Sequence, residues 1–254
     1  MNGFGPLLRK ELLEQWRTRR LLVVTVVFVA LGIGSPLLAR YTPELIQALG
    51  GVPFEIEFPE PTTRDAVDQF LKNLGQVGIL SAILLAMGSV ATEKERGTAA
   101  LLLSKPASRA AYLAAKLLAM TGTLTLALAL ASTAAYIYTV LLFDAPGIAG
   151  WSSMTALLLV SMLAYLALTF VGSALTRSAI AAAGIGIAGM ILLAIVAALP
   201  NLAPYLPAGI SGAPARALAM GTDPGPLLGP IVANVGLVAG LAMLAWLVFR
   251  NQEL

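Results

Sequence analysis

The chain has 254 residues, of which 58% are hydrophobic and 11% are charged, and its formal net charge is +3. Soluble domains carry about 25% charged residues, and a globular protein of this size could not cover its surface with so few. A soluble enzyme and a nucleic-acid-binding protein are therefore disfavoured. Histidine and cysteine are absent, which excludes disulfides, thiolate nucleophiles, histidine general bases and zinc sites with nitrogen and sulfur ligands.

The first twenty residues predict an amphipathic helix. Phe4, Leu8, Leu12 and Trp16 recur every four residues and share one face, while charged residues occupy much of the remainder. We expect this helix to lie along the inner leaflet of a lipid bilayer, with the tryptophan at the level of the headgroups. The alternative is a simple cytoplasmic extension of the first span that carries its charges.

Six long stretches without charged residues follow, and each can hold one transmembrane helix, which needs roughly 20 residues. Prolines stay out of the interiors of the predicted spans, with only Pro36 and Pro230 near ends. A cleaved signal peptide is the alternative for the first stretch, but the charged segment before it is longer than a usual n-region, so we predict an anchor. The spans are predicted near 21–38, 73–92, 116–142, 152–175, 179–199 and 228–249.

The segment 39–72, between the first two spans, is acidic and rich in proline and glycine. Helix-start signals at Thr42 and at Thr62 predict two short helices joined by an extended stretch. The acidic residues could bind a cation or a partner, or simply form a solvated surface.

The segment 93–115 after the second span is the most informative part of the sequence. Thr92 and Glu95 form a capping-box pattern, and Gly97 followed by Thr98 can end one short turn and start another. The apolar run 99–103 is too short to span a membrane. We expect a compact charged hairpin that suits docking of a cytoplasmic protein, the alternative being an ordinary loop with positive charge.

The basic residues indicate an orientation, because lysine and arginine are enriched on the cytoplasmic side of membranes. If the N-terminus is cytoplasmic, twelve of the sixteen basic residues fall inside, as do five of the thirteen acidic residues. We therefore predict that both termini are cytoplasmic. The four basic residues outside are Arg40, Arg64, Lys72 and Arg216.

No energy source is evident in the chain itself. The sequence has no Gly-x-x-x-x-Gly-Lys-Ser/Thr phosphate loop, and no predicted span has a charged residue near its centre. Proton- or sodium-coupled carriers usually need such intramembrane charges. We expect no enzymatic activity, no catalytic residue, and no bound metal or cofactor in this chain, with energy supplied by a partner.

The order of elements and one motif resemble the ABC type-2 transporter permease family. The motif is Glu-Lys-Glu-Arg-Gly-Thr at 93–98, a leucine run, Ser-x-Pro-x-Ser-Arg at 104–109 and a following helix with Lys116. The resemblance covers essentially the whole chain, but its specificity lies mostly in residues 92–116. It implies a coupling helix that docks on a separate ATP-binding subunit, with ATP bound by that subunit. The coupling residues carried over are Thr92, Glu93, Lys94, Glu95, Arg96, Gly97, Thr98, Ser104, Pro106 and Arg109.

The resemblance also implies a partly re-entrant external segment at 200–227, two ATPase copies and a second permease copy, as in a homodimer. The expected protein is all-α and polytopic, a single permease domain over 1–254 in a bacterial or archaeal cytoplasmic membrane. It would export or extract a substrate, with an extracytoplasmic accessory protein as a further candidate partner and no nucleic acid. The uncharged spans favour a lipid-like or hydrophobic cargo, or mechanical transmission, without identifying it. The alternatives are a nucleotide-independent channel or carrier, and a non-transporting membrane scaffold or assembly factor.

Overall fold

The structure is a computed structural model that describes residues 3–50, 59–103 and 108–252. Within these ranges every regular element is a helix, which confirms the predicted all-α class. In chain order the helices are α1 (Phe4–Arg17), α2 (Arg20–Gly50), α3 (Thr63–Met87), α4 (Ala91–Glu95), α5 (Thr98–Leu103), α6 (Arg109–Leu142), α7 (Ile148–Leu175), α8 (Ala179–Val196), the 3₁₀ turn η1 (Ala203–Tyr205), α9 (Pro207–Ile210), α10 (Ala213–Ala219) and α11 (Leu228–Arg250).

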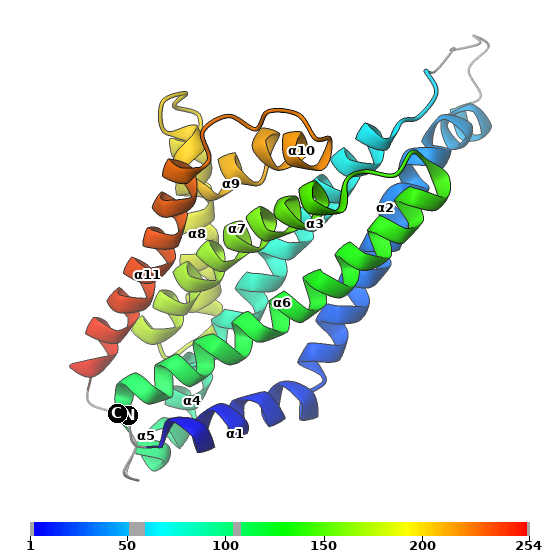
Figure 1. The fold of residues 1–254 in the computed structure, drawn as a ribbon. Helices are drawn as coiled ribbons and strands as arrows, with labels where there is room; N and C mark the ends of the chain where they lie inside the picture. Colours follow the sequence, from blue (N-terminus) through cyan, green and yellow to red (C-terminus); the bar gives the residue numbers. More distant parts are fainter. Residues whose placement is uncertain (1–2, 51–58, 104–107, 253–254) are drawn as a thin grey trace.

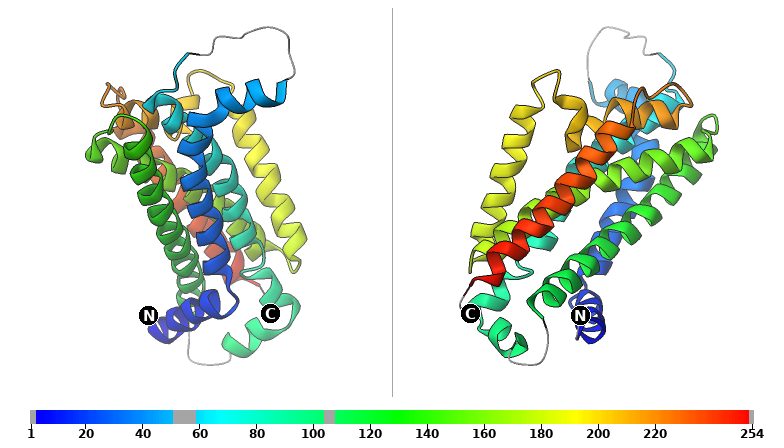
Figure 2. Two further views of the ribbon diagram at one scale, coloured as in Figure 1. Left: turned by 90° about the vertical axis from the view of Figure 1, so that its right-hand side faces the viewer. Right: turned by 60° about the vertical axis from the view of Figure 1, so that its left-hand side comes forward.

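Six helices of the described chain are long and apolar enough to cross a membrane, as predicted: α2, α3 with its continuation into α4, α6, α7, α8 and α11. They run side by side as a bundle (Figure 1). Helix α1 lies crosswise at one end, where α4, α5 and the described C-terminus also lie, and α9 and α10 lie at the opposite end (Figures 1 and 2). The segments predicted to be cytoplasmic thus share one end of the bundle.

Helix α7 forms the centre of the bundle and packs against α3, α8, α10 and α11. About 67% of its most apolar window is buried, compared with 11% for α8 and for α11, which lie at the periphery. Trp151 of α7 contacts the ring of Phe70 from α3, and its indole nitrogen donates to Ser132 of α6. The aliphatic side chains exposed on the outer helices are therefore those that would face lipid.

Helix α2 corrects the predicted end of the first span and the predicted extent of the loop after it. The helix continues through Pro36 and Pro43 to Gly50, so no helix starts at Thr42. A proline removes one backbone hydrogen bond and clashes with the preceding turn. Here α2 packs against α3 and α6, and this packing supports the helix where the prolines weaken it. The second predicted start is confirmed: α3 begins at Thr63, where the Thr62 N–H and hydroxyl both donate to Asp65.

The cytoplasmic segment forms two short helices, as the glycine pattern predicts. Helix α4 ends at Glu95, Gly97 has a φ of +68°, and α5 begins at Thr98. A positive φ favours glycine because it has no Cβ. The predicted capping box at Thr92 is wrong, because α4 begins at Ala91 and Thr92 lies inside it.

Candidate functional site

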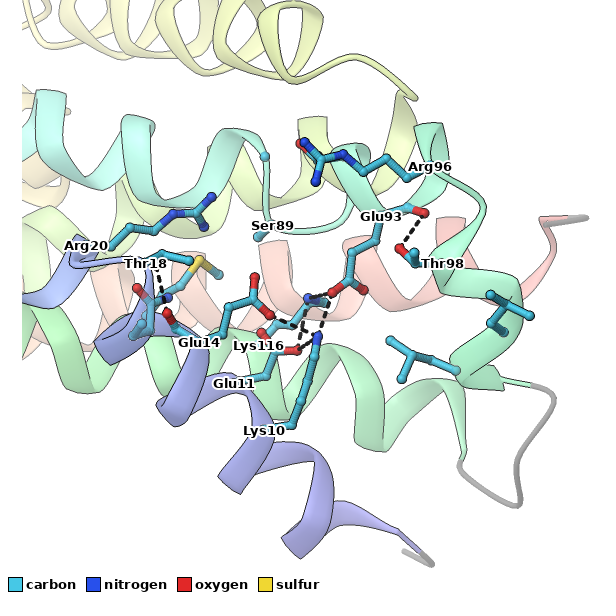
Figure 3. A pocket seen from close by; sticks show the side chains of 16 residues that line it. Lys10, Glu11, Glu14, Thr18, Arg20, Ser89, Glu93, Arg96, Thr98 and Lys116 are labelled. Carbon is cyan, nitrogen blue, oxygen red and sulfur yellow. Dashed lines mark hydrogen bonds and ion pairs between the residues drawn. The ribbon is translucent and has the colours of Figure 1, made fainter.

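A cavity of about 710 Å³ lies between α1, the bend that joins α3 to α4, α5 and α6. Its wall combines charged side chains with the apolar side chains of Leu102 and Met120. Figure 3 shows that Lys10 and Glu11 of α1, Glu93 of α4 and Lys116 of α6 point toward one another on one side of it. We call these four residues, with Tyr112, the charge cluster.

Glu93 is the centre of the charge cluster. Its Oε1 lies 2.7 Å from Lys10 Nζ and 2.9 Å from Lys116 Nζ. The Tyr112 hydroxyl donates to Glu93 Oε2 at 2.6 Å. One carboxylate of α4 is therefore bound to α1 through Lys10 and to α6 through Lys116 and Tyr112.

Glu11 provides the second connection between α1 and α6. Its Oε1 lies 3.0 Å from Lys116 Nζ and 2.9 Å from Lys10 Nζ. The Lys116 side chain is only 2% exposed, and a buried ammonium without partners would cost several kcal/mol. The carboxylates of Glu11 and Glu93 compensate the charge of the buried Lys116. Lys10 also pairs with Glu14 Oε2 at 3.0 Å.

The pairing of Lys10 with Glu93 and Glu11 changes the pKa of its ammonium group. Burial alone would lower the pKa of its ammonium group, but hydrogen bonds and charge attraction from Glu93 and Glu11 raise the pKa above its usual value. Lys10 therefore stays charged at every physiological pH, and the ion pairs of α1 with α4 persist.

Two of the predicted coupling residues turn inward, toward the ends of other helices. Lys94 is buried and donates to the Ala174 carbonyl near the end of α7 at 2.6 Å. Arg109 donates to the carbonyls of Phe249, Arg250 and Gln252 at the end of α11. Cations are favourable there, because the last carbonyls of a helix lack backbone partners. Lys94 thus joins the hairpin to α7, and Arg109 joins the start of α6 to the end of α11.

The remaining predicted coupling residues divide into three groups. Glu95, Arg96 and Gly97 are exposed on the hairpin. Thr92 lines the cavity, and Thr98 donates to the Glu93 carbonyl and closes the turn between α4 and α5. Ser104 and Pro106 lie outside the described residues. Their role in coupling, like that of the whole set, stays a prediction.

The two halves of the predicted apolar stripe of α1 differ in burial. Phe4 and Leu8 pack against the hydrophobic core, whereas the side chains of Leu12 and Trp16 are 49% and 69% exposed and are free to face lipid. The buried side chains are Leu7, Glu11 and Gln15, which recur every four residues on an adjacent face.

The sequence analysis missed Lys10, Glu11 and Tyr112 as site residues. The spacing of Leu7, Glu11 and Gln15 is a signal that could have found the buried face, since residues four apart lie on one face of a helix. No local signal connects that face with Tyr112 and Lys116, which are about a hundred residues further along the chain.

Comparison with known proteins agrees with this architecture. Residues 6–203 match a family model described as ABC-2 family transporter protein. The "Uncharacterized transmembrane protein YxlG" of Bacillus subtilis (strain 168) is 31% identical over 214 residues, which is 83% of each of the two chains. The matched range includes α1 from its third residue on, the hairpin and the charge cluster. This chain belongs to the ABC-2 family of transporter proteins.

Proposed function

We propose that this chain is the permease subunit of an ATP-driven transporter and that its α4–α5 hairpin docks on a separate ATP-binding subunit. Membership of the ABC-2 family supports this role, as does the absence of a phosphate loop from the sequence. Docking would occur where Glu95 and Ala100 are exposed on the hairpin.

The observation that carries the proposal is the position of Glu93. This residue belongs to the hairpin, yet its carboxylate is bound to α1 and to α6 within 3 Å. Buried ion pairs are costly to break, so a displacement of the hairpin would move α1 and α6 with it. A movement of the ATP-binding subunit would then be transmitted through the hairpin to the membrane-spanning helix α6, and the hairpin would stay attached to the bundle.

The proposal extends to the whole assembly. Two copies of the permease would pair as a homodimer with two copies of the ATPase, and the end with α1 and the hairpin would face the cytoplasm. ATP binding would close the ATPase dimer and rock the two permease copies, so that a path for export or extraction opens. The apolar spans favour a lipid-like or hydrophobic substrate, handled alone or with an extracytoplasmic accessory protein.

Co-purification tests the docking step. The tagged chain would be purified from membranes of its native host, and ATPases with a phosphate loop would be identified and quantified by mass spectrometry. We expect an ATPase with the wild type and about tenfold less with the variant Glu95→Lys/Ala100→Lys, which places two cations on the docking side. The control Glu60→Lys makes a similar change at the exposed opposite end of the bundle.

The two alternatives give different results in the same experiments. If no ATPase accompanies the wild type and transport in reconstituted vesicles does not need ATP, the chain is an independent channel or carrier. If neither ATPase nor transport is found, a scaffold is favoured. Equal recovery of the ATPase with the hairpin variant and the control would contradict docking at this surface.

A further inference from the structure

Two arginines outside the charge cluster line the same cavity. Arg20 is the first residue of α2, and Arg96 follows α4. Figure 3 shows their guanidinium groups pointing toward each other across Ser89, at the bend between α3 and α4. Over the described ranges of the chain, neither arginine has a carboxylate partner. Both arginines are exposed, and paired guanidinium groups suit a phosphate.

The α1 side of the same cavity has the opposite character. Glu14 and Gln15 both line it, and one Glu14 oxygen pairs with Lys10. The Gln15 side chain is about 94% buried, and its Oε1 has no hydrogen-bond partner. A buried acceptor without a donor is unfavourable, and an N–H or O–H group of a ligand that reached this oxygen would relieve it. A carboxylate beside it favours a donor with positive charge.

The cavity lies beside an apolar surface that would face lipid. Leu22, Val23 and Val26 follow Arg20 on α2 and are exposed by 55–57%. Leu102 and Met120 continue the apolar character into the cavity wall. A molecule with acyl chains on α2 would therefore bring its polar group to Arg20, at the level where headgroups lie.

We propose that this cavity binds the headgroup of a phospholipid that carries both a phosphate and a primary ammonium group, that is, phosphatidylethanolamine. The phosphate would lie between Arg20 and Arg96, and the ammonium group would donate to Gln15 Oε1 and the Glu14 carboxylate. The lipid belongs to the leaflet at the α1 end of the molecule. This site is independent of the proposed docking of an ATPase and is not a claim about the transported substrate.

Native mass spectrometry of the purified, detergent-solubilised protein tests the site. Phosphatidylethanolamine, phosphatidylglycerol and phosphatidylcholine with identical acyl chains would be added in equal amounts, and the lipid retained by the protein quantified. We expect about fivefold more phosphatidylethanolamine than either other lipid, since glycerol lacks the charge and choline cannot donate a hydrogen bond. The variant Arg20→Gln/Arg96→Gln should lose about fivefold of this retention.

Matched variants separate specific recognition from general attraction of lipid to cations. Arg9→Gln/Arg17→Gln removes the same charge from exposed positions of α1 that do not line the cavity, and should retain the lipid like the wild type. Glu14→Gln and Gln15→Leu should each bring retention of phosphatidylethanolamine close to that of phosphatidylglycerol. Size-exclusion chromatography and circular dichroism confirm that each variant is folded.

Three results would overturn the proposal. Equal retention of the three lipids by the wild type would contradict the assignment of the site to phosphatidylethanolamine. Equal loss in the cavity variant and the control variant would show attraction to net charge only. Displacement of the lipid by soluble glycerophosphoethanolamine, which has the headgroup but no acyl chains, would assign the cavity to a soluble phosphate ester instead.

Discussion

At the scale of single residues, Glu93 differs from its neighbour Glu95 although both lie in α4. The Glu93 side chain is 14% exposed and is held by two ammonium groups and a phenol, whereas Glu95 is exposed. The same residue type can therefore hold helices together at one position and face outward two positions later. A charge change at Glu93 would disturb the internal contacts as well as any docking surface.

We expect Glu93→Gln to lower the free energy of unfolding by about 1–3 kcal/mol, because a buried, charged hydrogen-bond acceptor is lost and Lys116 keeps only Glu11. The control Glu95→Gln should change it by no more than about 0.5 kcal/mol, as is usual for exposed positions. Thermal unfolding of both purified variants, followed by circular dichroism, measures the difference. Equal midpoints would mean that the charge cluster adds nothing to stability.

Two glycines of α2 give a second matched pair of positions. A Cβ at Gly32 would overlap the Ala131 carbonyl of α6, whereas a Cβ at Gly34 would meet open space. We expect Gly32→Ala to destabilise the protein by forcing α2 and α6 apart, and Gly34→Ala to stabilise it by about 0.5–1 kcal/mol through helix propensity. Thermal unfolding of the two variants should show shifts of opposite sign, and shifts of the same sign would contradict the close packing.

The glycines of α8 and α11 differ in how closely they pack. Gly186 and Gly189 of α8 allow close contact with α7, at Thr169 and at Leu168. A Cβ at Gly184, Gly236 or Gly240 would meet nothing within 4 Å. Sequence spacing marks the glycines but does not say which of them face a neighbouring helix.

At the scale of elements, the joint between α3 and α4 depends on a side chain from α7. Ser173 Oγ accepts hydrogen bonds from the backbone N–H groups of Val90 and Ala91, each at 3.0 Å, and donates to the Met87 carbonyl at 2.9 Å. This hydroxyl supplies the cap that the predicted pair of Thr92 and Glu95 does not form. A capping box is a local signal, and here a partner more than 80 residues away satisfies the same backbone groups.

Ser173→Ala should loosen this joint, because it leaves two buried N–H groups without an acceptor at a cost of about 1–3 kcal/mol each. We expect faster hydrogen–deuterium exchange in residues 88–92, measured by mass spectrometry in detergent. The control Thr125→Ala removes an exposed hydroxyl that donates only to its own helix, at Thr121, and should leave exchange in that segment unchanged. Equal exchange in both variants would place the cap elsewhere.

Several threonine hydroxyls inside the spans bond to the backbone of their own helix. Thr123, Thr133 and Thr139 donate to carbonyls of their own helix four residues earlier, and Ser132 shares a hydrogen bond with Thr155 of α7. Residue type and helical position account for these bonds, since a short hydroxyl reaches the preceding turn. Ser173 differs because α7 meets the bend of α3 and α4 at that level, which only the packing determines.

At the scale of the whole molecule, the stretches without charged residues predict the six membrane-spanning helices well. Each stretch alone contains the roughly 20 apolar residues that a span needs. Gly97 likewise marks its turn correctly. The end of α2 was missed because a proline signals a break only where nothing supports the helix on either side. The charge cluster was missed because Lys10, Glu93 and Lys116 come from three separate segments that meet only through packing.

The distribution of basic residues over the two ends of the bundle predicts the orientation of the chain in the membrane. Under the predicted topology, twelve basic residues fall on the cytoplasmic side and four on the other side. The wild-type chain has no cysteine, so single introduced thiols report their location without background. Glu60 and Thr222 are exposed at the end with α9 and α10, and Arg17 and Ala100 are exposed at the α1 end.

We expect Glu60→Cys and Thr222→Cys to react with a membrane-impermeant maleimide added to intact cells, because the positive end stays in the cytoplasm. Arg17→Cys and Ala100→Cys should react only in inverted membrane vesicles. The four variants are compared by gel shift, with a permeant maleimide as a control for thiol exposure. The reverse pattern would invert the orientation and place the hairpin where no cytoplasmic ATPase could reach it. Labelling of all four from one side would contradict the six-span arrangement itself.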